Sequence, residues 1–534
     1  MFNTLKITLN TKHFKQLKLL RNAIRSLTLK KDCKDETKEE KKDVGPKDGK
    51  LIDCILSTCI HKPSIIIIGA GMAGLSAAER LAACDLTNFT ILEATERPGG
   101  RIHSCWMDNV ITELGCSQIT GASTINSVYN LAAREGLKTQ RNGSTSLVLT
   151  SDGKAIEDCL ANMVYRAFLP IQLEAGKVFS MNCGKDYGSL KDFLTLRIDQ
   201  EIQKFPENFR YDVHRTFYGL LNCLTSSVGE DLSKVSADNY GSKVFIPGGN
   251  CILPDGLVHV LTPLLKNLPE KCIKYRKPVG IIKWGADLIK TKGPRVLVQC
   301  CDGECYGADY VIVTVPLGVL KDKANTMFCP KLPQCKLEAI NKLGFGHINR
   351  IFLKYNPPFW VRGGGNINLA WSHDELRDQS NWAKSVSCIE ELPNSDKYLQ
   401  VTIAGEDAEL MEEATDEEVV KRITKLLRQF TGDPTVPYPT AILRSTWSSH
   451  RYFCGANSYI KLNSHIGHQT DLGSPIPDMH SEECPVLLFA GEATIPGHYG
   501  TLHGARLSGI READRIMQLT KKMAGPPIAA KAIC

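Results

Sequence analysis

Short apolar runs, separated by glycine-rich and polar segments, mark the folded part of the chain. The run Ile65–Ile68 is apolar at every position, which is typical of a parallel strand buried on both faces. The following segment carries the small residues Ala73, Ala77 and Ala78, and it predicts a helix that lies close to its sheet. A second apolar run, Phe89–Leu92, predicts the next strand. Strand, helix and strand in this order indicate an α/β fold with a parallel sheet.

Later segments extend this pattern. Residues 308–320 and 487–494 each predict a buried strand that ends in a turn, and the segment after Gly500 predicts a helix that runs through Ala513. Residues 406–429 are rich in acids and place Leu, Val and Ile at roughly every third or fourth position. That spacing predicts an amphipathic surface helix or a pair of such helices.

Length and composition describe an ordinary globular protein. The 534 residues allow two or three domains and a large core, and the hydrophobic and charged fractions are 43% and 23%. The net charge of +7 is concentrated at the N-terminus, because residues 1–31 contain eight Lys or Arg and no acid. The rest of the chain is close to neutral, so no nucleic-acid partner is predicted. No run approaches 18 apolar residues, so no transmembrane segment is predicted either.

Residues 1–61 are expected to lie outside the folded domains. The basic stretch 1–31 resembles a mitochondrial transit peptide, and a disordered basic tail is the alternative. Residues 32–50 form a mixed charge run typical of a solvated linker, and residues 521–534 are expected to form a tail. We expect a cytoplasmic protein, with a mitochondrial location as the alternative. The C-terminal Lys531–Cys534 is not a peroxisomal signal of the S-K-L type.

The twenty cysteines are scattered through a long chain, which favours reduced thiols over a disulfide framework. Cys300, Cys301 and Cys305 flank Asp302-Gly303, which predicts a hairpin turn. No second C-x-x-C pair accompanies these cysteines, so we expect no metal site.

The stretch after the first strand, 69–74, is a G-x-G-x-x-G. Gly69 permits a tight turn out of the strand, Gly71 lets the backbone approach a pyrophosphate, and Gly74 lets the following helix pack closely on the sheet. The start of that helix at Met72 and Ala73 offers free N–H groups and a positive dipole end, which suit a diphosphate. The segment therefore predicts dinucleotide binding.

Two features after the second strand indicate which dinucleotide is bound. Glu93, followed by Ala94, ends the strand 19 residues after Gly74, where an acid accepts hydrogen bonds from an adenosine ribose. The turn Gly99-Gly100-Arg101 resembles the second phosphate-contacting turn of FAD-binding oxidoreductases in the glutathione-reductase-like group. That resemblance favours FAD and places Arg101 near the diphosphate or the isoalloxazine.

Several separated segments then resemble one family. They are Glu113–Gly121, Ile246–Gly249, Lys277–Trp284, Ala308–Leu320, Leu343–Trp360, Leu487–Thr494 and Gly500–Ala505. With these segments the chain resembles the flavin amine oxidase family, and within it the animal polyamine oxidases, over residues 63 to about 520. The resemblance implies an amine substrate, dioxygen and FAD. The FAD is expected to be non-covalent, because Gly491–Gly504 contains no cysteine, which covalently flavinylated relatives carry there.

The resemblance also implies contacts with the cofactor. Val279 would contact the adenine, and Glu492 would hold the ribityl chain. The helix start at Thr501 and Leu502 would face the pyrimidine edge of the flavin, where a helix N-terminus stabilises negative charge. The other residues that the resemblance places at the cofactor are Leu114, Gly115, Trp447, Gly491 and Gly500.

Candidate catalytic positions depart from the family pattern. Arg350 stands where the family has a lysine near flavin N5, and arginine does not release its proton near neutral pH. Thr120 replaces a histidine, and Asn222 replaces an acid that binds the distal ammonium, so groups suited to a polycation are lost. Tyr459 is the candidate aromatic wall for the amine, with an ordinary half-buried tyrosine as the alternative. His503 is expected to be structural.

These patterns predict an α/β protein in which a Rossmann-like FAD-binding domain is interleaved with a substrate-binding domain of mixed sheet and helices. We expect the FAD-binding domain in 62–145, 243–330 and 455–520, and the substrate-binding domain in 146–242 and 331–454. We expect a polyamine oxidase that cleaves a C–N bond of spermine, spermidine or an acetylated form, giving an aldehyde, an amine and hydrogen peroxide. Two alternatives stay open. One is an oxidase with another substrate, such as an amino acid whose carboxylate an arginine binds, and the other is an FAD-binding protein without turnover.

Overall fold

The computed structural model describes residues 62–141, 146–181, 186–285, 288, 293–361, 363–376, 381–393, 395–479, 481 and 484–523. Pro63–Met517 forms one compact unit. The predicted leader and most of the predicted tail lie outside the described residues. No helix in the described ranges is long and apolar enough to cross a membrane.

A five-stranded parallel sheet is built from strands that are distant in the sequence. Its order is β22-β13-β1-β2-β9, from Leu487–Phe489, Tyr310–Val313, Ile65–Ile68, Phe89–Leu92 and Ile273–Lys274. The four isoleucines of β1 are all buried, because neighbouring strands and helices cover both faces of the sheet. The strands predicted at 65–68, 89–92, 308–320 and 487–494 are confirmed.

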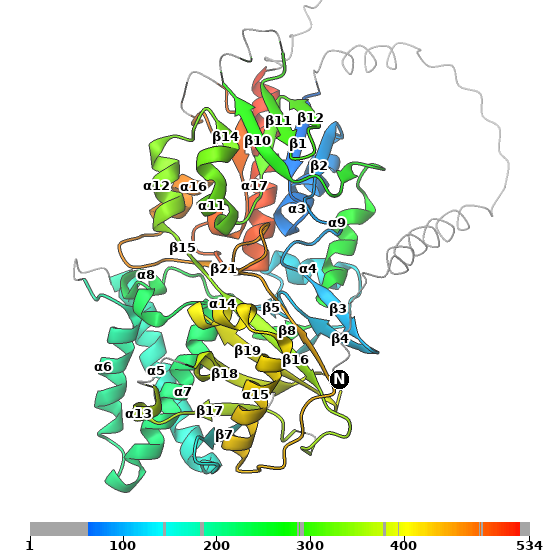
Figure 1. Cartoon of the computed structure of the whole chain (residues 1–534). Coiled ribbons are helices and arrows are strands. Elements are labelled where there is room, and N and C mark those ends of the chain that lie inside the picture. Colours follow the sequence, from blue (N-terminus) through cyan, green and yellow to red (C-terminus); the bar gives the residue numbers. More distant parts are fainter. Residues whose placement is uncertain are drawn as a thin grey trace, which may run out of the picture. The chain divides into compact units, whose positions relative to one another are not determined.

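Helices α3 (Met72–Ala82) and α17 (Leu502–Met523) lie beside this sheet (Figure 1). Small residues allow their close approach. A Cβ on Gly74 would stand 2.0 Å from the carbonyl oxygen of Gly69, and a Cβ on Gly509 would stand 2.0 Å from that of Ala73. Only glycine fits at either position, so the tight helix packing predicted for Gly74 is confirmed.

A second, four-stranded sheet has the order β12-β11-β10-β14. Its strands are Cys305–Ala308, Val296–Cys300, Val279–Trp284 and Phe328–Cys329. Strands β11 and β12 pair antiparallel across Asp302-Gly303, so the predicted hairpin is confirmed. Helices α11 (Leu317–Met327), α12 (Gln334–Lys342) and α16 (Gly467–Gly473) surround one apolar core together with this sheet and the parallel sheet.

The largest sheet has six strands in the order β20-β16-β19-β18-β17-β7. They are Ala441–Arg444, Ile348–Lys354, Tyr398–Ala404, Val386–Glu391, Ile367–Ala370 and Leu147–Thr150. Its pairs are antiparallel except β17 with β7, so it is a mixed sheet as predicted. One face packs on α14 (Glu406–Glu413) and α15 (Asp416–Thr431), the predicted amphipathic pair, and Thr415 and Glu418 form a capping box at α15.

Helices α5 (Asp158–Met181), α6 (Leu190–Ile202), α7 (Arg210–Val228) and α8 (Ala237–Tyr240) share a further apolar core. Of these, α7 lies against β17 and β18 of the six-stranded sheet. Smaller elements join the sheets: β3 (Ser104–Met107), β4 (Val110–Glu113), β5 (Ile119–Thr120), α4 (Ser127–Arg134), β6 (Gln140–Arg141), β8 (Asn250–Ile252), α9 (Thr262–Lys266), β15 (Gly344–Gly346), α13 (His373–Leu376) and β21 (Asn457–Tyr459). The predicted α/β fold is confirmed, and the exact domain limits stay a prediction.

Candidate active site

Two glycine turns meet at the carboxyl ends of β1 and β2. Gly69 has a φ of +107°, and a parallel bridge links Gly71 to Gly99. A Cβ on Gly71 would meet no atom within 4 Å, so the backbone there borders open space. Gly71 is also the N-cap of α3 and supplies no side-chain cap, which leaves the first N–H groups of the helix available. Free N–H groups beside open space form a cradle for an anionic group such as a diphosphate.

Glu93 lies at the end of β2 and is 6% exposed. Its Oε1 accepts hydrogen bonds from the N–H and the hydroxyl of Thr95, at 2.8 and 2.7 Å. Its Oε2 accepts the N–H of Ala70 at 2.7 Å. A carboxylate oxygen has two acceptor sites, so Oε2 keeps one for a further donor. The role predicted for Glu93 toward a ribose agrees with this geometry and stays a prediction, as does that of its neighbour Ala94.

Glu492 joins three distant segments at the carboxyl edge of the parallel sheet. It is 5% exposed, and its Oε1 accepts a hydrogen bond from Arg101 Nη1 at 2.9 Å. Its Oε2 accepts the N–H of Gly500 at 2.7 Å and the hydroxyl of Ser458. Arg101 also donates to the carbonyl oxygen of Ala456 at 2.6 Å. The structure thus brings together three residues, 101, 492 and 500, that were predicted to lie at one cofactor.

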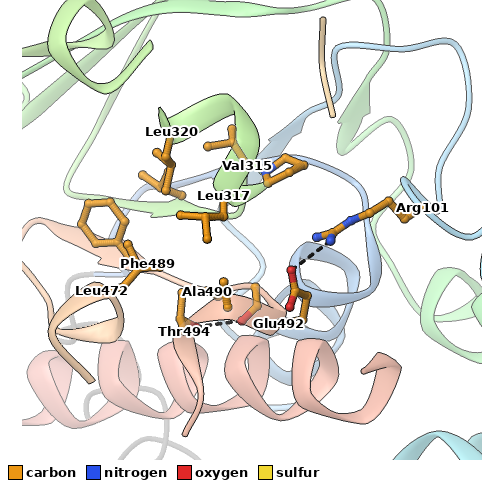
Figure 2. Close-up of a pocket in the computed structure, with 13 residues that line it drawn as sticks. Arg101, Val315, Leu317, Leu320, Leu472, Phe489, Ala490, Glu492 and Thr494 are labelled. Carbon is orange, nitrogen blue, oxygen red and sulfur yellow. Dashed lines mark hydrogen bonds and ion pairs between the residues drawn. The ribbon is translucent and has the colours of Figure 1, made fainter. Parts of the chain in front are cut away.

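A small hollow of about 10 Å³, partly open to solvent, borders this ion pair (Figure 2). Its floor comes from the ends of β13 and β22 and from the first turn of α11. The lining residues are Arg101, Val313, Val315, Pro316, Leu317, Leu320, Leu472, Phe489, Ala490, Gly491, Glu492, Ala493 and Thr494. Gly491 has a φ of +138°, and a Cβ there would meet no atom within 4 Å.

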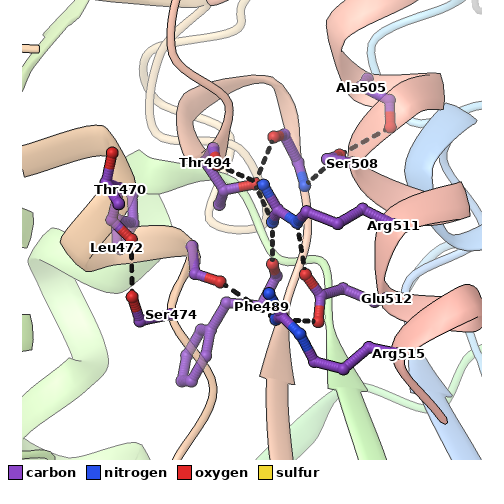
Figure 3. A network of polar contacts seen from close by, with 12 residues as sticks. Thr470, Leu472, Ser474, Phe489, Thr494, Ala505, Ser508, Arg511, Glu512 and Arg515 are labelled. Carbon is purple, nitrogen blue, oxygen red and sulfur yellow. Dashed lines mark hydrogen bonds and ion pairs between the residues drawn. The ribbon is translucent and has the colours of Figure 1, made fainter. Parts of the chain in front are cut away.

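A polar network on α17 holds the turn that carries Glu492 (Figure 3). Arg511 donates to the carbonyl oxygens of Thr494 and Phe489 at 2.7 and 2.8 Å. Glu512 has no exposed surface and accepts hydrogen bonds at 2.6 Å from both Arg511 and Arg515. The strand end and the helix are therefore fixed to each other on both sides of Glu492.

The start of α17 lies at Thr501 and Leu502, as predicted. The Thr501 hydroxyl accepts the N–H of Gly504 at 3.0 Å and donates to the carbonyl oxygen of His498 at 2.6 Å. Burial, together with the nearby positive charges of His498 and Lys243, lowers the pKa of His503 to about 4. His503 is therefore neutral near pH 7, in agreement with a structural role.

Arg350 is held by the chain itself. Its Nη1 donates to the carbonyl oxygens of Glu113, at 3.1 Å, and of Gly115, and its Nη2 donates to the hydroxyl of Ser117 at 3.0 Å. Trp447 Nε1 donates to the carbonyl oxygen of Leu114 at 2.8 Å. The structure therefore gathers residues 114, 115, 350 and 447 around one loop.

The other candidates lie on different elements. Tyr459 is 6% exposed, with its ring against Gly344 and its hydroxyl 3.5 Å from Glu230 Oε2, so it is more deeply buried than the half-buried alternative. Asn222 donates to the carbonyl oxygens of Lys384 and Val386, both at 3.2 Å. Thr120 is exposed at the end of β5, and Val279 begins β10 in the four-stranded sheet.

Sequence reasoning missed an acid on the same sheet face as Arg350. Arg350 pairs with Thr402, which in turn pairs with Cys388, and the next row on this face places Gln400 between Phe352 and Glu390. Residues opposite each other, or two apart along a strand, share a face. Burial raises the pKa of Glu390, and the positive charge of Arg350 opposes that shift. The alternation of side chains between the two faces of the strand 386–391 is the sequence signal that could have predicted the position of Glu390.

A second missed residue is Lys243, in the loop between α8 and β8. Its Nζ lies 5.4 Å from the centre of the Tyr499 ring and beside Gly500. No periodicity marks a lysine in such a loop, and its neighbours in space are more than 250 positions away, so no local pattern predicts its place.

Comparison with known proteins identifies the family. The family described as flavin containing amine oxidoreductase matches residues 72–517. The chain belongs to this family. It is 34% identical over 489 residues to the human protein named peroxisomal N(1)-acetyl-spermine/spermidine oxidase, covering 86% of this chain and 95% of that one. It is 33% identical to the bovine protein of that name, with the same shares covered.

A solved structure of putrescine oxidase bound to putrescine has the same fold. It matches with a TM-score of 0.64 and 19% identity over 85% of this chain and 99% of that one. At this identity the similarity concerns the fold alone.

The residues of the site fit the FAD of this family. Open space borders Gly71 and Gly491, where a cofactor needs backbone without side chains, and the uncapped start of α3 offers donors to its diphosphate. The protein is an FAD-dependent amine oxidase that uses an amine and dioxygen. Its FAD is non-covalent, in keeping with the absence of cysteine from 491–504.

Proposed function

We propose that this flavoenzyme oxidises a C–N bond of a polyamine, either spermine, spermidine or an acetylated form, giving an aldehyde, an amine and hydrogen peroxide. One observation carries the proposal: Arg101 and Gly500 both donate hydrogen bonds to the carboxylate of Glu492. These contacts join residues that the resemblance to the family predicts at the cofactor, in a chain whose mammalian relatives are named for acetylated polyamines.

Bound FAD supplies the acceptor for a hydride equivalent from the α-carbon of the amine. The chain's own residues position the reactants. We propose that Gly69, Gly71, Met72, Ala73 and Gly74, with Gly99 and Gly100, hold the diphosphate through backbone N–H groups. The start of α17 at Thr501 and Leu502 would stabilise negative charge at the cofactor through its dipole.

Arg350 acts as a positioning residue in this proposal. Its guanidinium donates to three acceptors of the loop 113–117, so it fixes Leu114 and Gly115 beside Trp447. It keeps its positive charge at every pH near neutrality and takes no part in proton transfer. We propose that Glu390, on the same sheet face, binds the distal ammonium of the substrate in place of the acid that the family has at Asn222.

The amino-acid alternative also stays open. A carboxylate needs an arginine with free donors, and while Arg350 Nη1 and Nη2 donate to the chain, its Nε has no hydrogen-bond partner among the described residues. The non-catalytic alternative predicts bound flavin that no amine reduces.

One experiment separates these possibilities. The full-length protein is purified, and its flavin absorbance is followed without oxygen after addition of spermine, N-acetylspermine or a panel of amino acids. We expect a polyamine to bleach the flavin bands. Bleaching by amino acids alone would favour the first alternative, and a flavin that stays oxidised with every donor would favour the second.

For the location in the cell, we propose the cytoplasm. The named relatives are peroxisomal proteins and give no support to a mitochondrial address for residues 1–31. Fractionation of cells expressing the full chain tests this.

A further inference from the structure

The loop that carries Lys243 is fixed to the turn that opens α17. Val244 N–H donates to the carbonyl oxygen of Gly497 at 2.7 Å. On the other side of Lys243, the Ser242 hydroxyl lies 3.4 Å from the Tyr499 hydroxyl. Two contacts therefore hold the backbone on both sides of Lys243, and its side chain extends along the turn toward the active site.

The amine of Lys243 stands over Gly500. Its Nζ is 3.6 Å from the point where a Cβ of Gly500 would stand, and 5.4 Å from the centre of the Tyr499 ring. Gly500 donates its N–H to Glu492, the acid at the centre of the cofactor cradle. Lys243 Nζ therefore lies close to the residue that links Glu492 to the start of α17.

This amine has no partner among the described residues: no hydrogen-bond acceptor and no carboxylate within ion-pair distance contacts it. Glu492 is the acid whose charge acts on it, but both Glu492 oxygens are taken by Arg101, Ser458 and Gly500. Solvent reaches the Lys243 side chain, yet burial lowers its pKa from the ordinary value of 10.5. The amine thus lies over the Tyr499 ring and beside Gly500, at a position that solvent also reaches.

Oxidation of a protonated amine requires a base close to the substrate nitrogen. The lone pair of the substrate nitrogen must be free before its α-carbon loses a hydride, whereas a polyamine arrives protonated at pH 7. Arg350 and Thr120 do not accept a proton near neutral pH. His503, with a pKa of about 4, is too weak a base to hold the proton of an ammonium.

We propose that Lys243 is a further catalytic residue, the base that takes a proton from the ammonium of the bound substrate. The inference rests on the proposed function above. In this step the substrate N–H bond breaks, its electron pair stays on the substrate nitrogen, and the proton forms a new bond with Lys243 Nζ. A neutral amine and a lysine ammonium result, so charge and atoms balance. The lysine proton returns to solvent after product release.

The test compares Lys243→Met with Lys243→Arg in the full-length, FAD-loaded protein. A control is Lys425→Met, which removes an exposed lysine on α15. The rate of anaerobic flavin reduction by spermine is measured from pH 6 to pH 10, and FAD affinity is measured separately by fluorescence titration. Other titratable groups face the amine, namely Glu492, Tyr499, His498 and His503, and all of them are kept in every variant.

We expect Lys243→Met to lower the reduction rate about 100-fold at pH 7.5, since general bases typically contribute that much. The rate should recover at pH 10, where the substrate loses its proton in solution. Lys243→Arg, which keeps the charge but not the base, should be equally slow at pH 7.5 and should also recover at pH 10, and FAD affinity should not change in any variant. A wild-type pH profile in Lys243→Met, or a loss that is equal at every pH, would overturn the inference and leave the proposed function standing. If wild-type flavin is reduced by no polyamine, both proposals fall.

Discussion

At the scale of single residues, Glu390 has an accessible carboxylate oxygen in a half-buried setting. Gln400 Nε2 donates to Oε2 at 3.2 Å, and no ion pair links Glu390 with Arg350 among the described residues. Arg350 donates instead to the loop 113–117, so its charge is near Glu390 without neutralising it through direct contact. A half-buried carboxylate without an ion-pair partner suits a cationic ligand.

We therefore expect Glu390→Gln to raise the KM for spermine about tenfold to a hundredfold, because a hydrogen bond to a charged group contributes about 1.5–3 kcal/mol. The kcat should change little, since the distal ammonium is far from the reacting bond. Steady-state oxygen consumption measures both constants. The exposed Glu417→Gln on α15 is the matched control, and an unchanged KM in Glu390→Gln would assign the distal ammonium to another group.

The residues that the sequence predicted well are those whose role depends on neighbours a few positions away. Gly69, Gly71 and Gly74 lie within one turn, and their spacing alone requires the backbone geometry that the structure has. The surroundings of Arg350 and Lys243 depend on contacts across more than 200 positions, which no local pattern contains. The resemblance to the family predicted a role for Arg350 at the site, but it did not predict the three acceptors that the side chain has in the structure.

At the scale of elements, the cradle between β1 and α3 offers a change that separates folding from cofactor binding. A Cβ on Gly71 meets nothing within 4 Å, and its φ of −77° suits any residue. Gly71→Val should therefore leave the fold intact while its methyl groups fill the space beside the diphosphate cradle.

We expect Gly71→Val to be purified with its circular dichroism spectrum unchanged and with little FAD, its affinity falling at least a hundredfold. Fluorescence titration of the apoprotein with FAD measures this. Gly176→Ala is the control, since a Cβ there also meets no atom within 4 Å but lies in α5, away from the cradle. Wild-type FAD affinity in Gly71→Val would show that the cofactor does not use this turn.

The local pattern of apolar and polar residues predicted helices and strands best where these elements are long or fully apolar. The strands at Ile65–Ile68 and Phe89–Leu92 and the helices at 406–429 follow their hydrophobic periodicity. The two-residue strand β9 joins the parallel sheet only because β2 already offers a free edge. So short a strand has no periodicity, and its existence depends on a partner far away in the sequence.

At the scale of the whole molecule, Glu512 ties the end of the parallel sheet to α17. Its fully buried carboxylate accepts from Arg511 and Arg515, and Arg511 in turn donates to Phe489 and Thr494. Removing one member of a buried ion pair leaves the other charges without compensation, which costs about 3–5 kcal/mol.

Glu512→Ala should therefore lower the free energy of unfolding by about 3–5 kcal/mol, measured by urea denaturation of the FAD-loaded protein. It should also weaken FAD binding, because the turn that carries Glu492 loses its support. Glu417→Ala, at an exposed position on α15, is expected to change stability by less than about 0.5 kcal/mol. Equal free energies of unfolding for Glu512→Ala and Glu417→Ala would mean that Arg511 and Arg515 find other partners.

The order of the parallel sheet has a consequence for how the enzyme is made. β22 pairs with β13, but it is the last strand of that sheet to leave the ribosome, and Glu492 and the first turn of α17 follow it. A nascent chain that has exposed β1, α3 and β2 already has the glycine turns but lacks the carboxylate that connects Arg101, Ser458 and Gly500. We therefore expect flavin insertion to complete only once Glu492 and Gly500 have left the ribosome, and a product of premature termination before residue 492 to be a colourless protein.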